Sequence, residues 1–205
     1  MKIQTEVLLT DLANRTKQLI EEAKQFREKP EEELNYKINP ESWSVLECLE
    51  HLNLYGRYYI PEIKKSISAQ LSVSSPSVPL DEFSSGQALQ RGRPEPVFKS
   101  GWLGNYFANS MLPKEKLNKM KTFKNMNPLN SKLDKRVIDE FIDQQEEMLR
   151  LLEESRKVSL NKTRTAISIS KLIKLKLGDT FRFVIYHNQR HMVQALRLRS
   201  VTLLH

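Results

Sequence analysis

The stretch WSVLECLEHL, residues 43–52, joins a helix start to a candidate metal ligand. Ser44 and Glu47 form a Ser-x-x-Glu pattern, in which each side chain can satisfy the backbone N–H of the other residue at the first turn of a helix. The apolar positions that follow recur at helical spacing: Val45, Leu49, Leu52, Tyr59, Ile63 and Ile67. The pattern predicts a helix with His51 on its inner face and a kink or break near Tyr58, because Pro61 lacks a backbone N–H.

Three further stretches show the apolar period of amphipathic helices. They cover about residues 3–26 and 134–156, and a region that begins after Gly178 and Asp179, where Asp179 is a suitable N-cap. Four helices around one core predict an all-α fold, a four-helix bundle formed by a single domain over residues 1–205.

The connections between these helices differ in length and composition. Residues 71–130 hold six of the nine prolines and four of the six glycines, which predicts an extended loop or insertion. A link of that length permits a crossover, so that the second and third helices can run parallel. The apolar and aromatic stretch 102–112 predicts at least one extra helical turn packed on the bundle, and residues 167–170 alternate weakly, as a strand does.

Composition excludes several classes of protein. The chain has 205 residues and one cysteine, Cys48, which excludes an internal disulfide framework and a multi-cysteine zinc site. No apolar run approaches the roughly 18 residues of a membrane span. The first residues, MKIQTEVLLTDLANR, lack the apolar core of a signal peptide. These features favour a cytoplasmic location.

The net charge of +8 is concentrated in two segments. Residues 91–136 contain eleven Lys or Arg against three acids, and residues 156–176 contain seven Lys or Arg and no acid. Such segments can attract nucleic acid, an anionic membrane surface or a carboxylate-bearing small molecule, or they can form an ordinary solvated surface. No nucleic-acid-binding motif accompanies them, so nucleic acid is not an expected partner.

The histidines form the most specific chemical pattern. His187 and His191 are four residues apart, so both imidazoles lie on one face of the fourth helix. That face also carries apolar residues, and His51 is the natural third ligand from the second helix. Three neutral imidazoles suit a first-row divalent ion and leave coordination positions open. Position 188 is Asn, so the glutamate of zinc peptidases is missing. The alternative is three satisfied core histidines.

Two motifs resemble those of the DinB/YfiT-like superfamily. WSVLECLEHL at 43–52 is similar to its second-helix signature, a Trp-Ser opening followed by an inward histidine, and HNQRHMVQ at 187–194 is similar to its fourth-helix signature. Leu177-Gly178-Asp179 also stands where such proteins begin that helix. The resemblance covers the chain in order and spacing, except at 71–130, which is longer than usual.

The resemblance implies an up-down-down-up bundle with a three-histidine site for a divalent metal, zinc or nickel, on His51, His187 and His191. It also implies a homodimer and a small-molecule substrate. Characterised members include thiol-dependent S-transferases and a mycothiol-dependent isomerase, while many members have no assigned reaction. A bound metal would lower the pKa of a low-molecular-weight thiol and aim the thiolate at an electrophile. The basic segments could then help to hold an acidic thiol.

Several residues near the histidines have two interpretations. Glu47 is either a general base or ligand orienter, or only the partner of the capping box, and Gln194 is a polar neighbour of a metal-bound water. Tyr55 and Tyr58 either donate to a bound oxyanion or pack. Cys48 is either a soft ligand or a small buried hydrophobe.

Two functions of different classes follow. The first is a metal-dependent enzyme that activates a thiol, as an S-transferase does, or water, as a hydrolase does, toward a small electrophile. The alternative is a non-catalytic metal-binding or basic interaction protein, in which the segments 91–136 and 156–176 recruit an acidic partner. A dedicated general base near the metal would favour the enzyme, and Glu47 is the sole candidate.

Overall fold

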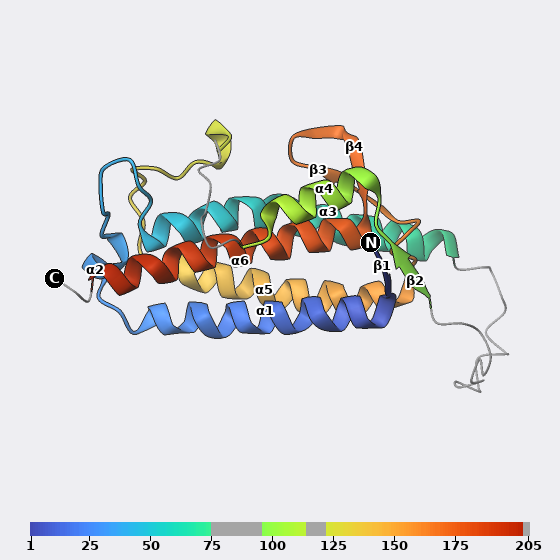
Figure 1. Ribbon diagram of the computed structural model, residues 1–205, viewed down its shortest axis with the longest axis horizontal. Helices are drawn as coiled ribbons and strands as arrows, with labels where there is room; N and C mark the ends of the chain where they lie inside the picture. Colours follow the sequence, from blue (N-terminus) through green and yellow to red (C-terminus); the bar gives the residue numbers. More distant parts are fainter. Residues whose placement is uncertain (75–95, 114–121, 203–205) are drawn as a thin grey trace.

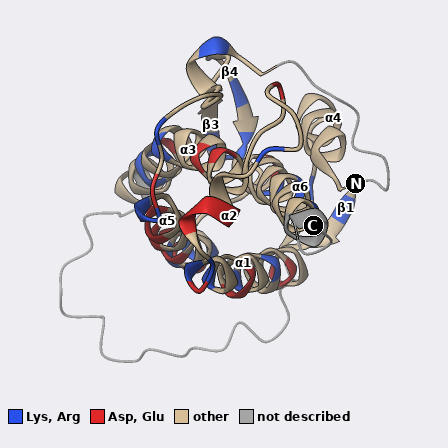
Figure 2. Cartoon of the chain, turned by 90° about the vertical axis from the view of Figure 1, so that its left-hand side faces the viewer, with Lys and Arg blue, Asp and Glu red and all other residues tan. Residues whose placement is uncertain are grey.

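The computed structural model describes residues 1–74, 96–113 and 122–202, and four long helices dominate them (Figure 1). These helices are α1 (Thr5–Arg27), α3 (Val45–Ser74), α5 (Arg136–Glu154) and α6 (Leu177–Thr202). Viewed from its end, the bundle is a ring in which α1 packs on α5, α5 on α3, α3 on α6 and α6 on α1 (Figure 2). The predicted all-α helical bundle is confirmed.

Interhelical ion pairs give the direction of the helices. Arg57 of α3 pairs with Glu140 of α5, and Lys64 pairs with Glu147, so the residue numbers rise together and the two helices run parallel. The colour gradient in Figure 1 shows α1 and α6 running in the opposite direction. The link from α3 to α5 therefore returns along the length of the bundle.

The helix α3 begins as the sequence predicts. The backbone N–H of Ser44 donates to Oε2 of Glu47 at 2.9 Å, and the N–H of Glu47 donates to Oγ of Ser44 at 3.2 Å. The helix does not break near Tyr58, because α3 continues through Pro61 to Ser74, and a kink there stays a prediction. Contacts with α5 and α6 along α3 offset the hydrogen bond that Pro61 cannot make.

Four short helical segments join the long ones. They are α2 (Glu31–Asn35), α4 (Trp102–Met111), η2 (Lys124–Met126) and η3 (Ser155–Lys157). The extra helix expected within 102–112 is α4, and it packs along α6. The expected single domain and the insertion at 71–130 stay predictions, since part of that segment lies outside the described residues, as does part of the basic segment 91–136.

Within the part of the chain that the structure describes, two small antiparallel sheets complete the fold. The strand β1 (Lys2–Gln4) pairs with β2 (Val97–Lys99), and β3 (Arg164–Ile167) forms a hairpin with β4 (Ser170–Lys176). Because Ile3 pairs with Phe98, α1 begins at Thr5 rather than at residue 3. The weak alternation at 167–170 corresponds to the end of β3 and the turn that follows.

Asp179 does not act as the expected N-cap of α6. That helix begins two residues earlier, at Leu177. The carboxylate of Asp179 instead accepts the backbone N–H of Gly101, which precedes α4, at 2.8 Å, and it pairs with Arg182. The side chain therefore satisfies a helix start that is distant in the sequence and joins α4 to α6.

The core consists of two apolar clusters with a polar layer between them. One cluster contains Tyr59 and Phe181, and the other contains Leu49 and Met192. Buried polar side chains occupy the level between the clusters: Thr16, His51, Asn53, Gln145, His187 and Asn188. A polar layer inside a bundle is costly unless it is hydrogen-bonded or has a function.

In residues 1–74, 96–113 and 122–202, no helix combines the length and apolarity needed to cross a bilayer.

Candidate metal centre

Three histidines meet in the polar layer of the bundle. His51 comes from α3, and His187 and His191 come from α6. One ring nitrogen of each lies within 4.8 Å of those of the other two. The ring centroids are separated by 5.0, 4.6 and 4.7 Å. The expected meeting of these three side chains is therefore confirmed, and the cluster could hold a metal ion.

Hydrogen bonds fix the ring orientation of two of the histidines. Nδ1 of His51 lies 2.6 Å from the carbonyl oxygen of Met126, and Nδ1 of His191 lies 3.1 Å from Oε1 of Gln194. Carbonyl oxygens only accept hydrogen bonds, so each Nδ1 carries the proton and each Nε2 carries a lone pair. This arrangement is the outer-sphere support that metal-binding histidines ordinarily have.

His187 argues against three ordinary core histidines. Its Nδ1 is buried and has no hydrogen-bond partner among the described residues. Its Nε2 lies 3.2 Å from Nε2 of His51, whose lone pair faces it. A buried polar atom without a partner costs about 1–3 kcal/mol, which a purely structural residue would avoid. The orphaned Nδ1 shows that His187 is not placed for its own hydrogen bonds, and the facing Nε2 atoms fit a site built for a cation.

Burial keeps the imidazoles neutral. It lowers the pKa of His51 to about 4 and the pKa of His191 to about 3. The pKa of His187 is lowered well below its ordinary value, first by burial and then by the neighbouring histidines. Neutral imidazole is the form that binds metals, so near neutral pH protons do not compete for these nitrogens.

A cavity of about 720 Å³ lies over the histidines. Aromatic and apolar side chains from α3, α4, α6 and the loops between them form much of its wall: Trp43, Tyr55, Tyr106, Phe107, Met111, Phe123 and Phe183. This volume lies in the range of small-molecule sites. Among the described residues of the lining, Arg190 and Glu41 are charged, and Glu41 is exposed.

Most of this wall could not be inferred from the sequence. The apolar stretch 102–112 was the one available signal, and it supplies Tyr106, Phe107 and Met111. Other lining residues, such as Phe123 and Leu129, come from loops, whose positions depend on tertiary contacts.

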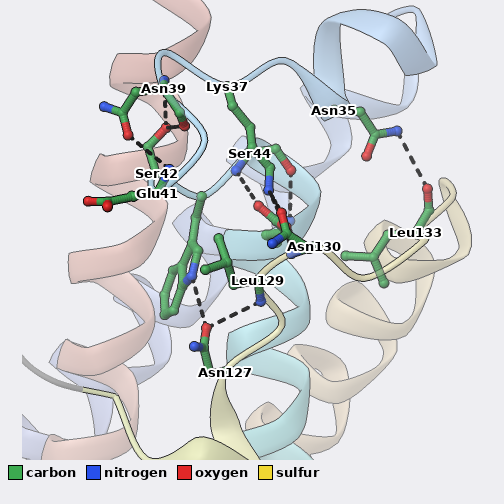
Figure 3. Close-up of polar contacts among 12 residues, drawn as sticks. Asn35, Lys37, Asn39, Glu41, Ser42, Ser44, Asn127, Leu129, Asn130 and Leu133 are labelled. Atoms are coloured by element: carbon green, nitrogen blue, oxygen red, sulfur yellow. Dashed lines mark hydrogen bonds and ion pairs between the residues drawn. The ribbon is translucent and has the colours of Figure 1, made fainter.

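Glu47 lies outside this cavity lining. Its side chain is 2% exposed, and Oε1 accepts Nζ of Lys37 at 2.7 Å and the backbone N–H of Asn130 at 2.6 Å. The other oxygen belongs to the capping box with Ser44. Figure 3 shows these contacts around Lys37, Ser44 and Asn130. Both carboxylate oxygens of Glu47 thus serve the helix start and the loop beside it.

The loop that contains Met126 is tied to the start of α3. Nε1 of Trp43 donates to Oδ1 of Asn127 at 3.1 Å, and this oxygen also accepts the backbone N–H of Leu129 at 3.2 Å (Figure 3). Asn130 has φ of 63°, a left-handed conformation that Asn tolerates. These contacts hold the carbonyl that orients His51.

The other candidates of the sequence occupy distinct places. Gln194 and Tyr55 line the cavity, and the ring centroids of Tyr55 and His187 are 4.5 Å apart. Tyr58 instead donates its hydroxyl to the carbonyl of Ile167 at 2.9 Å. Cys48 is fully buried in an apolar cluster, where burial raises the pKa of its thiol, and it lies outside the histidine cluster.

Comparison with known proteins gives one match. The sequence model of the DinB superfamily matches residues 8–195, which include all three histidines. Searches of curated proteins and of solved structures gave no significant match.

Proposed function

The chain belongs to the DinB superfamily, and we propose that it is a metal-dependent enzyme that activates a low-molecular-weight thiol, or water, toward a small electrophile. One observation carries the proposal. The imidazoles of His51, His187 and His191 converge at the wall of an aromatic cavity of about 720 Å³. A closed structural site would not need such a cavity beside it.

The three histidines would hold the ion through their Nε2 atoms, since Nδ1 of His51 and of His191 carries a proton. Three neutral nitrogen donors favour zinc or nickel over magnesium or calcium, which prefer oxygen ligands. A divalent ion bound there supplies a lowered pKa for a thiol or a water molecule, which makes either a nucleophile near neutral pH.

The surroundings favour a thiol over water as the nucleophile. Hydrolysis gains from a general base beside the attacking water. Among the described residues that line the cavity, Glu41 carries the only carboxylate, and its side chain is exposed. A thiol transfers as a thiolate and needs no separate base once its proton has been lost. The S-transferase reaction is therefore the one that the cavity supports better.

The cavity residues would orient the reactants. Gln194 and the carbonyl of Met126 hold two imidazoles in the ligating tautomer. Burial raises the pKa of Tyr55 to about 12, so its hydroxyl stays protonated and can donate to an oxyanion of the substrate. The aromatic wall excludes water and favours an apolar electrophile.

The test begins with metal content, measured by mass spectrometry on protein purified without a histidine tag. We expect about one zinc or nickel ion per chain, lost in His187→Ala and kept in His205→Ala, which removes the remaining histidine. The loaded protein is then assayed for conjugation of glutathione, cysteine or bacillithiol to an aryl halide, and for hydrolysis of esters and amides.

The outcomes separate the functional classes. Thiol conjugation that requires His187 supports the transferase, and hydrolysis that requires it supports the hydrolase. One bound ion with neither activity favours the alternative, a non-catalytic metal-binding protein. The homodimer and the cytoplasmic location stay predictions from the sequence.

A further inference from the structure

Five apolar side chains project into solvent from α4 and the β3–β4 hairpin, two elements that contribute residues to the cavity wall. Their exposed fractions are 86% for Trp102, 66% for Tyr106, 54% for Ile169, 94% for Leu172 and 40% for Ile173. The first two belong to α4, and the other three belong to the β3–β4 hairpin. Because Tyr106 and Ile169 are exposed and also line the cavity, the cavity opens between these two elements. We call the five residues the apolar rim.

The hairpin holds its part of the apolar rim in a fixed position. The hydroxyl of Tyr58 donates to the carbonyl of Ile167 at 2.9 Å, and the backbone N–H of Ser168 donates to the hydroxyl oxygen of Tyr59 at 3.1 Å. Both tyrosines belong to α3, so the turn is attached to the bundle. The exposure of the hairpin residues is therefore not the fraying of a loose loop.

Strand pairing places the most exposed residue on a bulge. The register shifts between Ala166, which pairs with Lys174, and Ile167, which pairs with Ser170. The residues of β4 between these two pairs, 171–173, have no partner in β3. Bulges of this kind redirect side chains away from the sheet. Leu172 is directed into solvent in this way and is 94% exposed.

Polar contacts hold α4 against α6 at the same opening. Arg182 donates to the side-chain oxygens of Asn105 and Asn109, and Asp179 accepts the backbone N–H of Gly101. These contacts occupy one face of α4. Trp102 and Tyr106 are one turn apart and are left exposed.

The hairpin and the segment that leads into α4 carry basic residues and no acidic ones, while α4 itself carries no charged side chain. Residues 96–113 and 156–176 together contain eight Lys or Arg and no Asp or Glu. Lys99, Arg164 and Lys174 are exposed on the strands, and Figure 2 shows basic residues along β4. Arg156 differs from these residues, because its guanidinium already forms ion pairs with Glu6 and Glu153.

We propose that this face docks on an anionic phospholipid bilayer, with the apolar rim inserted at the interface and the lysines and arginines against the headgroups. Trp and Tyr favour the boundary between water and hydrocarbon, and each basic residue near an anionic surface adds about 1 kcal/mol. The cavity then opens toward the bilayer, from which an apolar substrate can enter. The inference goes beyond the proposed function and does not depend on a bound metal.

Two other occupants fit the face less well. A second copy of the chain in a two-fold contact would bring these basic residues against themselves. Nucleic acid would pair with the lysines, but it is held by phosphate contacts and base stacking and has no use for exposed Ile and Leu side chains. The combination of aliphatic, aromatic and basic side chains matches an anionic bilayer.

The test is flotation of the full-length protein with vesicles of phosphatidylcholine alone or mixed with phosphatidylglycerol. We expect binding to the mixed vesicles that weakens with added salt. The double variant Leu172→Ser/Ile173→Ser and the variant Lys174→Glu should each weaken binding about tenfold. Ile38→Ser and Lys17→Glu are matched controls: both residues are exposed, Ile38 before α3 and Lys17 on α1, and binding should not change.

Fluorescence gives a second readout. The chain has two tryptophans, so in Trp43→Phe the emission comes from Trp102 alone. Mixed vesicles should shift this emission to shorter wavelength. The proposal is overturned if the protein does not float with the mixed vesicles, or if the controls lose as much binding as the rim variants. It is also overturned if the rim variants dissociate a dimer without affecting flotation, or if the face binds duplex DNA and not vesicles.

Discussion

Nε2 of His51 lies 3.2 Å from Nε2 of His187, although 136 residues separate the two histidines in the chain. The contact crosses from α3 to α6 in the polar layer between the two apolar clusters. One of these nitrogens presents a lone pair to the other, and the remaining nitrogen of His187 has no partner among the described residues. The site therefore lowers the free energy of unfolding of the metal-free protein, as functional sites often do.

The first prediction concerns that stability. Replacing His187 with Leu removes an unsatisfied buried polar atom and leaves an apolar side chain of similar size. Without metal, His187→Leu should raise the free energy of unfolding by about 1–2 kcal/mol, measured by urea denaturation in the presence of a chelator, because Nε2 of His51, which loses this neighbour, borders the cavity and can bond to water. The same variant should bind no metal. A loss of stability in the metal-free state would show that the imidazole is a satisfied core residue.

The second prediction concerns pH. The pKa of His51 is about 4 in the folded protein, below its ordinary value of 6.5, so the unfolded chain binds more protons between these values. Stability of the metal-free protein should therefore fall as the pH is lowered through that window. His51 alone should account for about 2 kcal/mol between pH 7 and pH 5. Thermal unfolding in chelator at the two pH values measures the change.

The contribution of His51 is isolated by a variant. In His51→Gln, which cannot titrate, the decrease in stability between the two pH values should be smaller by that amount. Equal pH dependence in the wild type and in His51→Gln would mean that His51 titrates normally in the folded state.

The third prediction separates the two roles of Glu47. Because its carboxylate bonds to Ser44, Lys37 and Asn130, Glu47→Ala should lower the free energy of unfolding by about 1–3 kcal/mol. Metal content of the folded protein should not change. Loss of metal from a folded Glu47→Ala protein would instead assign this residue to the metal site.

The fourth prediction concerns the wall of the cavity. A Cβ atom on Gly104 would lie 2.4 Å from Oδ2 of Asp179, so Gly104→Ala forces α4 away from α6. We expect a loss of about 1–3 kcal/mol in unfolding free energy. At Gly101 the nearest atom would lie 3.5 Å away, an ordinary contact, so Gly101→Ala is the matched control and should cost less than about 1 kcal/mol. Equal effects would mean that α4 is not held by close packing.

The sequence predicts the parts of this protein that depend on local chemistry. The capping box of Ser44 and Glu47 and the spacing of His187 and His191 are local patterns, and both have the expected geometry. His51 could be assigned as the third ligand because helix bundles build their sites from inward side chains on facing helices. Pro61 does not end the helix, because contacts with neighbouring helices outweigh one missing hydrogen bond.

Other features have no local signal. The strands β1 and β2 have three residues each, too short to show alternation, and they pair across more than ninety residues of sequence. Asp179 looks like an N-cap, and its true partners at the start of α4 appear only in the fold. The acceptor for His51 is a backbone carbonyl, that of Met126, and any residue type can supply a carbonyl.

X-ray absorption at the edge of the bound zinc or nickel tests the central claim most directly. The protein should be purified without a tag and loaded with one equivalent of metal. The account predicts imidazole nitrogens at roughly 2.0–2.1 Å, with the outer-shell scattering of about three histidine rings and no sulfur. A sulfur at about 2.3 Å, which could come only from Cys48 or a methionine, or a spectrum without imidazole scattering would contradict a centre built from His51, His187 and His191.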